Sequence, residues 1–235
     1  MEPLELKIKS VIGFNGKVPG ALHYTPCGGY VVYPLGSFLV IKNIKTGKEA
    51  FLEGHNNDVS CIAMSNSGER LASGINHLSG VKADCLIWDL TKAKKLLDSG
   101  KVMIGEHCVL YRLKQHLARV QAVGYSCDDR FLATLGGQDD NALVIWDAET
   151  GESICGAPAH ADSSLCLKWV NGRNDRLVTG GNYHVKVWQI DFSLPKLNAM
   201  EAKLGSVRRV VVSLAITEDD QVHLSAIFFH PTLPN

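Results

Sequence analysis

The sequence predicts an all-β fold in which one small sheet is repeated along the chain. The first observation is an aliphatic run closed by tryptophan, which occurs at 85–88, 143–146 and 185–188. The second is a strand-like segment that runs into glycine before each of these, at 70–74, 131–137 and 176–181. The third is an alternating apolar segment before that, at 59–64, 120–125 and 165–170. Apolar alternation with period two, bounded by Gly, Asn and Asp turns, is typical of short half-buried strands.

Two further copies of the unit are less regular. Residues 38–48 repeat the pattern that surrounds Trp146, with Lys42 in the position of the tryptophan. A fifth copy begins with the apolar run 210–216, after which the pattern fades. The chain therefore contains four recognisable units and a fragment of another.

Such a unit cannot bury both of its faces alone, so neighbouring units are expected to stack. A repeat of ~40–45 residues that is entered by Gly-His and left by Trp-Asp is the WD40 pattern of β-propeller blades. Here the entry is Gly54-His55, and the exits are Trp88-Asp89 and Trp146-Asp147. We expect WD40 propeller blades over residues 1–221, with an irregular insertion at 98–115, and a divergent tail over 222–235.

Four blades and a fragment are fewer than closed propellers usually carry, so we expect an incomplete ring. Its two ends would be unpaired, and unpaired sheet edges promote aggregation. The isolated chain is therefore expected to self-associate. A strand-like segment at 4–12 could pair with the last blade of a complete ring.

The marker residues of the repeat are expected to hold each blade together and not to be catalytic. Each tryptophan should lie between blades and donate its indole N–H to a hydroxyl on the preceding strand. The histidine and an acidic residue, Asp139 or Asp140 in the middle repeat, would extend that chain, which is rigid only when every member is satisfied. In the third repeat Gln189 and Asn182 replace expected aspartates, so its network should be incomplete. The expected network comprises His55, Ser73, Trp88, His116, Thr134, Asp139, Trp146, His160, Thr179 and Trp188.

Composition and charge argue against several classes of function. The 24 Lys and Arg balance 24 Asp and Glu, which gives no electrostatic case for nucleic acid or an anionic membrane surface. The N-terminus lacks the apolar region of a secretory signal, and no apolar run approaches the ~20 residues that cross a bilayer. The seven cysteines form no C-x-x-C pair, so we expect no metal and no cofactor. Their pattern indicates a reducing, cytoplasmic compartment.

Motifs that would indicate an enzyme are absent or have simpler interpretations. Residues 136–141 offer oxygen ligands, but they lack the spacing of a calcium-binding loop and suit a tight turn. His107 and Cys108 are adjacent, and adjacent residues on a strand point to opposite faces. No phosphate-binding glycine loop or nucleophile elbow occurs. We therefore expect no enzymatic activity and no small-molecule substrate.

The insertion at 98–115 is inferred from spacing. Trp88 and Trp146 are 58 residues apart, whereas Trp146 and Trp188 are 42 apart. We expect a surface loop there, which is either a docking element or a tolerated insertion without a role. Basic residues of the loops are candidates for contact with an acidic partner, and the alternative for each is a solvated surface charge. These candidates are Arg112, Lys114, Arg119, Arg173, Arg208 and Arg209.

Several strings resemble one WD-repeat family in particular, the cilia- and flagella-associated protein 52 family. They are 11–19, 33–36, 51–61, 82–84, 135–140 and 154–156, and the first lies outside the general WD pattern. The resemblance covers about residues 8–97 and 116–220, whereas 98–115 and the tail from Val222 depart from it. It implies the N-terminal part of a long protein with two propellers that lies inside axonemal doublet microtubules.

The function that the resemblance implies is a non-enzymatic scaffold of cilia or flagella. As a microtubule inner protein, it would bind tubulin and neighbouring axonemal proteins and stabilise the doublet wall. The alternative is a cytosolic WD-repeat adaptor in another multiprotein assembly, such as a substrate receptor. A propeller hydrolase would need acid, base or metal groups that converge on the central channel, and the sequence offers no such cluster.

Overall fold

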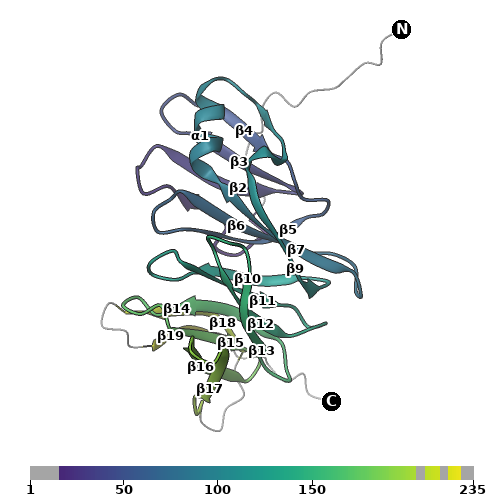
Figure 1. Cartoon of the computed structure of the whole chain (residues 1–235), viewed down its shortest axis with the longest axis vertical. Coiled ribbons are helices and arrows are strands. Elements are labelled where there is room, and N and C mark those ends of the chain that lie inside the picture. The colour runs from purple at the N-terminus through teal and green to yellow at the C-terminus, as the bar shows by residue number, and fades with distance from the viewer. Residues whose placement is uncertain (1–15, 205–209, 218–221, 229–235) are drawn as a thin grey trace.

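The computed structural model describes residues 16–204, 210–217 and 222–228. Over these residues the chain forms small antiparallel sheets that follow one another in sequence and stack along the long axis (Figure 1). The predicted all-β class with WD40-type blades is confirmed, and the described sheets form an open arc and not a closed ring. The strand expected at 4–12 lies outside the described residues.

We name the sheets blades A to D. Blade A contains β1 (His23–Tyr24), β2 (Tyr30–Leu35), β3 (Phe38–Asn43) and β4 (Glu49–Leu52), with β8 (Met103–Ile104) added at its edge. Blade B contains β5 (Val59–Met64), β6 (Arg70–Ile75), β7 (Lys82–Asp89) and β9 (Val109–Leu117). Blade C contains β10 (Val120–Tyr125), β11 (Phe131–Gly136), β12 (Ala142–Asp147) and β13 (Ser153–Pro158). Blade D contains β14 (Ser164–Trp169), β15 (Arg176–Gly181), β16 (His184–Asp191) and β17 (Lys196–Glu201).

The repeat in the sequence becomes a repeated strand register. In blades B, C and D the tryptophan of the third strand lies opposite a leucine of the second, as Leu71–Trp88, Leu132–Trp146 and Leu177–Trp188. Each tryptophan therefore occupies the same position in its sheet.

Turn residues are shared between the degenerate copy and the regular ones. Thr46-Gly47 and Thr150-Gly151 close the turns after the third strands of blades A and C. Both glycines have positive φ, 68° and 74°, a region that glycine adopts without the steric cost of a Cβ. The N–H of Gly47 donates to the Asn43 carbonyl and that of Gly151 to the Asp147 carbonyl, each at 2.9 Å.

The cores lie between blades. Trp88 is fully buried among residues of blades A and B, and Trp146 packs in a cluster shared by blades B and C. Trp188 is 2% exposed and packs in a cluster shared by blades C and D. Blades B and C therefore bury both of their faces against neighbouring blades, as stacking of the repeats requires.

Asparagines also join successive blades at one end of the innermost strands. The side-chain amide of Asn66, which follows β5, donates to the Ser126 carbonyl of blade C at 2.9 Å. Asn171 follows β14 and donates to the Thr217 carbonyl at 2.9 Å. The two residues occupy equivalent positions in blades B and D.

The insertion is not the surface loop that the spacing predicts over 98–115. Helix α1 (Leu90–Asp98) directly follows β7, then β8 pairs in parallel with β4, and a 3₁₀ turn η1 (Glu106–Cys108) leads into β9. Residues 109–115 belong to β9, which is the outer strand of blade B. The extra residues are therefore those between Leu90 and Cys108, and they connect blade B to the edge of blade A.

This connection is well packed. Leu90, Ala93 and Leu97 of α1 are buried in the cluster between blades A and B, together with Ile104 of β8. The N–H of Phe51 donates to the Val102 carbonyl at 2.7 Å. The insertion thus covers the outer edge of blade A.

Part of the expected divergent tail belongs to the fold. β18 (Val210–Ile216) pairs antiparallel with β19 (Val222–Phe228), and the pair lies beside blade D (Figure 1). Val211 and Leu214 of β18 are buried against blade D. The pairing shifts register around Ser213, which breaks the simple alternation that the sequence predicts for 210–216.

The helical content of the described segments is small. Helix α1 has nine residues. Across these segments no helix has the length and apolar character needed to cross a membrane.

Candidate functional site

The polar network is most complete in blade C. The indole N–H of Trp146 donates to Thr134 Oγ1 at 2.8 Å, and Thr134 Oγ1 lies 2.7 Å from His116 Nε2. His116 Nδ1 lies 3.0 Å from Asp140 Oδ2. A carboxylate only accepts hydrogen bonds, so Nδ1 carries the proton, and in a neutral imidazole Nε2 then accepts from the Thr134 hydroxyl. The chain of donors is therefore oriented from the tryptophan to the histidine and from the histidine to the aspartate.

The acidic member of this network is Asp140 and not Asp139. Asp140 Oδ2 also accepts from the backbone N–H of Leu117 at 2.9 Å. Burial raises the pKa of Asp140, but the hydrogen bonds from His116 and Leu117 outweigh it, so the net pKa lies below the usual value. Asp139 points to the surface, where Ser79 Oγ donates to it at 2.5 Å. The two aspartates are adjacent in a tight turn, and only the carboxylate of Asp140 faces His116.

Blade B contains a shorter version of the network. Ser73 Oγ lies 2.6 Å from His55 Nε2 and accepts from the Trp88 indole at 2.7 Å. His55 Nδ1 is buried and has no hydrogen-bond partner among the described residues. No residue of blade B therefore takes the part that Asp140 plays in blade C.

Blade D retains only one of these hydrogen bonds, and its histidine is not where the repeat predicts. Trp188 donates to Thr179 Oγ1 at 2.9 Å. His160 does not bond to Thr179; its ring stacks on His184 with centroids 3.8 Å apart. His184 is fully buried, and its Nε2 lies 3.1 Å from Ser164 Oγ. The buried histidine of blade D is thus His184 on β16, a position for which the repeat pattern contains no signal.

Burial of His55 predicts a loss of stability in acid. Burial, and to a smaller extent the nearby Arg112 charge, lower the pKa of His55 to about 4. Because the pKa is lower in the folded state than the unfolded value near 6.5, the unfolded state binds the proton first as pH falls. The free energy of unfolding should thus be unaffected by His55 above about pH 6.5 and fall by about 1.4 kcal/mol per pH unit between about 6.5 and 4.

Urea unfolding of wild type and of a His55→Gln variant at about pH 7.5 and about pH 5 would measure this contribution. His23 and His184 also have lowered pKa values, chiefly through burial, so the comparison with the variant isolates His55. We expect the variant to lose about 2 kcal/mol less than wild type between the two pH values. Equal losses would contradict the assignment.

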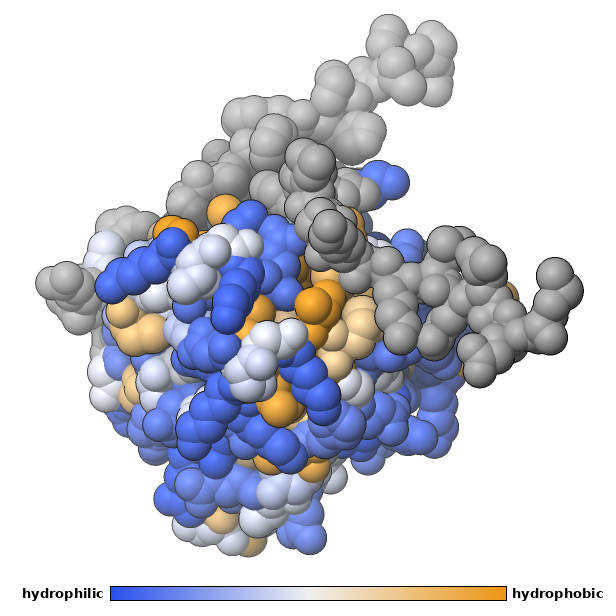
Figure 2. Space-filling view, turned by 90° about the horizontal axis from the view of Figure 1, so that it is seen from above, coloured by the Kyte–Doolittle hydropathy of each residue, from blue (hydrophilic) through white to orange (hydrophobic). Residues whose placement is uncertain are grey.

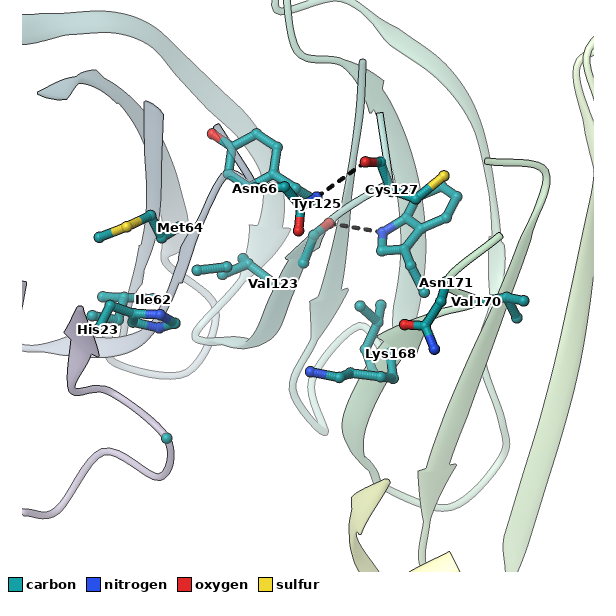
Figure 3. A pocket seen from close by; sticks show the side chains of 15 residues that line it. His23, Ile62, Met64, Asn66, Val123, Tyr125, Cys127, Lys168, Val170 and Asn171 are labelled. Carbon is teal, nitrogen blue, oxygen red and sulfur yellow. Dashed lines mark hydrogen bonds between the residues drawn. The ribbon is translucent and has the colours of Figure 1, made fainter. Parts of the chain in front are cut away.

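A cavity of about 520 Å³ lies against the innermost strands on the concave side of the arc. Figure 3 shows side chains of β5, β10 and β14 around it, with the ammonium group of Lys168 and the imidazole of His23 at its polar side. Burial, and to a smaller extent the Lys168 charge, lower the pKa of His23. The described lining contains no carboxylate, so the cavity offers no pair of acid and base groups.

The cavity wall also contains contacts between blades. The Trp169 indole donates to the Gly124 carbonyl at 2.8 Å, and the Asn66 amide donates to the Cys127 carbonyl at 3.3 Å (Figure 3). Neither residue was expected to be important from the repeat pattern. Trp169 stands at the end of β14, where the sequence offered only an apolar strand residue.

Two of the basic candidates for partner binding are neutralised within the chain. Arg112 lies 2.9 Å from Asp84 and 2.8 Å from Glu106 and donates to the Gly54 carbonyl. Arg173 makes two hydrogen bonds to Asp175, which hold the pKa of that carboxyl below its usual value. Both arginines are therefore ion-paired within the chain, and their contact with an acidic partner stays a prediction.

The other candidates differ from one another. Lys114 is exposed on β9, whereas Arg119 is half-buried and its Nε has no partner among the described residues. Arg208 and Arg209 lie outside the described residues. Of the four described candidates, Arg112, Lys114 and Arg119 lie in or directly after β9, whereas Arg173 follows β14 of blade D.

The described part of the chain contains neither a cluster of metal-binding side chains nor a buried thiol that is activated as a nucleophile. Within it, no group of three or more His, Cys, Asp and Glu side chains is placed to hold a metal ion. Burial raises the pKa of the Cys61 and Cys166 thiols to about 12, which makes both poor nucleophiles. Residues 136–141 form a turn, in which the Asn141 N–H donates to the Gly137 carbonyl at 2.8 Å.

Comparison with known proteins agrees with this architecture. The WD40 family (WD domain, G-beta repeat) matches residues 47–89 and 107–147. The chain has the same fold as one in "Crystal Structure of Mitotic Checkpoint Complex", with a TM-score of 0.58 and 17% identity over 85% of this chain and 68% of that one. It also resembles "Structure of U3-55K", with a TM-score of 0.57 and 19% identity over 79% of this chain and 52% of that one. At such identities the likeness concerns the fold alone.

Curated relatives are more similar. Cilia- and flagella-associated protein 52 of Chlamydomonas reinhardtii is 42% identical over 221 residues, which are 94% of this chain and 33% of that protein. The Homo sapiens protein of the same name is 35% identical over 92% of this chain and 33% of its own length. WD repeat-containing protein 90 of Mus musculus is 29% identical over 63% of this chain and 7% of its own length. The chain thus spans about a third of the length of the relatives that match nearly all of it, and it belongs to the cilia- and flagella-associated protein 52 family.

Proposed function

We propose that this chain is a non-enzymatic scaffold of the ciliary or flagellar axoneme, where it binds tubulin and neighbouring proteins and stabilises the doublet wall. The observation that carries the proposal is the 42% identity to cilia- and flagella-associated protein 52 over 94% of the chain. The WD40 blades supply a rigid frame with exposed loops, the arrangement that proteins use for binding partners.

The chemistry of the polar groups supports a scaffold. His116 of β9, together with Thr134 and Asp140 of blade C, is joined to the buried Trp146, and both His116 and Thr134 are almost fully buried. A catalytic base must reach a proton of its substrate. These groups are occupied by one another and serve to fix the strands of the blade.

The proposal predicts that the chain is retained in the axoneme. The 235-residue chain carrying an epitope tag would be expressed in a flagellate cell, and its axonemes would be extracted with detergent and then with high salt. We expect the chain to remain with the doublet microtubules after both extractions, because contacts inside the wall are shielded from salt. An unfused tag expressed in the same cells is the control.

Cross-linking of the retained material distinguishes the proposal from the alternative. Cross-links to tubulin and to other doublet proteins would support a wall scaffold. A chain that stays in the soluble cytoplasm and is cross-linked to ligase or signalling subunits would contradict it and would favour a cytosolic adaptor.

A further inference from the structure

The insertion between blades B and A carries a cluster of lysines that the WD40 repeat does not explain. The matched WD40 segments end at Asp89 and resume at His107, so α1 and β8 lie between them. Lys95 of α1 and Lys101 after it are both exposed. The turn between β3 and β4 in blade A adds exposed Lys45 and Lys48. We call these four residues the lysine corner.

Hydrogen bonds show that the two segments of the lysine corner lie together. Lys48 Nζ donates to the Asp98 carbonyl at 3.3 Å, and the Asn43 amide donates to Asp98 Oδ1 at 3.2 Å. The backbone N–H of Lys101 donates to the Leu96 carbonyl at 3.0 Å, which keeps Lys101 at the end of the helix. The turn of blade A is thus fixed to the C-terminal end of α1.

The carboxylate of Asp98, which lies beside these lysines, accepts hydrogen bonds from other side chains. Asp98 Oδ2 accepts from the Tyr30 hydroxyl at 2.6 Å, and Oδ1 accepts from Asn43. Of the residues that the structure describes, none forms an ion pair with a lysine of the corner. In a chain of zero net charge, these four lysines outnumber the single carboxylate of Asp98 beside them, so the corner has a local positive field.

Capping of the helix does not account for the lysines either. Positive side chains near a helix C-terminus commonly satisfy its last carbonyls. Here the Lys95 and Leu97 carbonyls accept from the N–H groups of Ser99 and Gly100, and Leu96 accepts from Ser99 Oγ and the Lys101 N–H. Lys48 alone serves as a cap, at the Asp98 carbonyl. The ammonium groups of Lys45, Lys95 and Lys101 are left for an external anion.

Apolar side chains accompany the lysines. Ile44 is 46% exposed beside Lys45, and Val102 and Met103 are 37% and 36% exposed after Lys101. Figure 2, which looks onto the blade A end of the molecule, shows a mainly hydrophilic described surface with apolar atoms in small separate groups. Charge mixed with small apolar contacts suits a polypeptide, whereas a phosphate backbone would need only the charge.

We infer that the lysine corner is a docking surface for an acidic segment of a partner protein that also carries apolar side chains. Carboxylates of the segment pair with Lys45, Lys95 and Lys101, and its apolar side chains rest on Ile44, Val102 and Met103. This binding does not depend on where in the cell the chain resides.

Binding of a fluorescein-labelled peptide of glutamates with interspersed leucines, measured by anisotropy at low salt, tests the inference. The variant Lys45→Glu/Lys95→Glu/Lys101→Glu should bind the peptide about tenfold or more weakly, because three rim cations become repulsive. The matched control Lys82→Glu/Lys196→Glu/Lys203→Glu changes the net charge equally, at exposed lysines in blade B and in or just after blade D. It should leave the affinity within about twofold of wild type.

Several outcomes would overturn the inference. The first is that the wild-type chain does not bind the acidic peptide. The second is that the corner variant and the control variant lose the same amount of affinity for it. Poly(U) RNA and phosphatidylserine vesicles serve as further probes, and tighter binding of either at the lysine corner would show a general anion site. Thermal unfolding of all variants checks the fold, and the Lys→Arg triple should retain binding. A negative result in the peptide-binding experiment does not change the expected retention of the chain in extracted axonemes, so each proposal can be contradicted without the other.

Discussion

Replacing Trp146 with alanine is expected to lower the free energy of unfolding by about 3–5 kcal/mol, the usual cost of truncating a buried aromatic side chain. Trp146 is 4% exposed and packs with Ile87 and Leu113 of blade B, across the boundary from its own sheet. Its removal opens a cavity between blades B and C and takes away the indole donor to Thr134. Urea unfolding followed by far-ultraviolet circular dichroism would measure the loss.

Two further variants separate the causes of this loss. Trp146→Phe keeps an aromatic ring between the blades but has no N–H, so about 1–2 kcal/mol should be lost. Leu194→Ala alters a side chain that is 72% exposed and should change stability by less than about 0.5 kcal/mol. An alanine variant that unfolds at the same urea concentration as wild type would show that the inferred packing between blades is wrong.

The fold could be predicted from the sequence because its signals are local and repeated. Alternation and glycine turns define each strand, and a tryptophan at the end of three successive runs fixes the register. In the structure Trp88, Trp146 and Trp188 occupy equivalent positions opposite a leucine of the neighbouring strand. Even blade A could be aligned although Lys42 replaces its tryptophan, because Thr46-Gly47 repeats the turn sequence Thr150-Gly151, and both glycines have positive φ in the structure.

The details of the polar network could be predicted only in part. A hydroxyl one strand away from each tryptophan follows from the register, and Ser73, Thr134 and Thr179 all accept the indole N–H. Which of two adjacent aspartates faces inward depends on the path of one tight turn, which periodicity does not specify. In blade D, His184 is fully buried and His160 stacks on it, an arrangement that depends on side-chain packing and has no signal in the repeat.

The prediction of a surface loop at 98–115 is wrong because the structure of the insertion depends on contacts with a distant part of the chain. Spacing showed that residues were added, but an amphipathic helix of nine residues is short and gave a weak signal. β8 has two residues and exists only because the edge of β4 is available to pair with it. Strands that form by contact with a distant edge cannot be found from their own sequence.

A methyl group added at Gly136 should disrupt the network of blade C from within. Gly136 ends β11, and a Cβ there would overlap the Asp140 carboxylate and lie 2.7 Å from His116 Nδ1. Asp140 would have to leave His116, whose buried Nδ1–H would then lack an acceptor. We expect Gly136→Ala to cost about 2–5 kcal/mol, from overpacking and from the unpaired donor together.

A double-mutant cycle assigns that cost to the contact with Asp140. Asp140→Ala removes the carboxylate with which the new methyl group collides, so adding Gly136→Ala to it should cost less than in the wild-type background, with only the close contact to His116 left. Gly105→Ala is the matched control, because its nearest neighbour would be His107 Cε1 at an ordinary 3.7 Å. Proton NMR adds a direct readout, since the His116 Nδ1–H signal should be protected from exchange in wild type and lost in Gly136→Ala. Equal costs in the two backgrounds would mean that Gly136 is required for some reason other than the approach of Asp140 to His116.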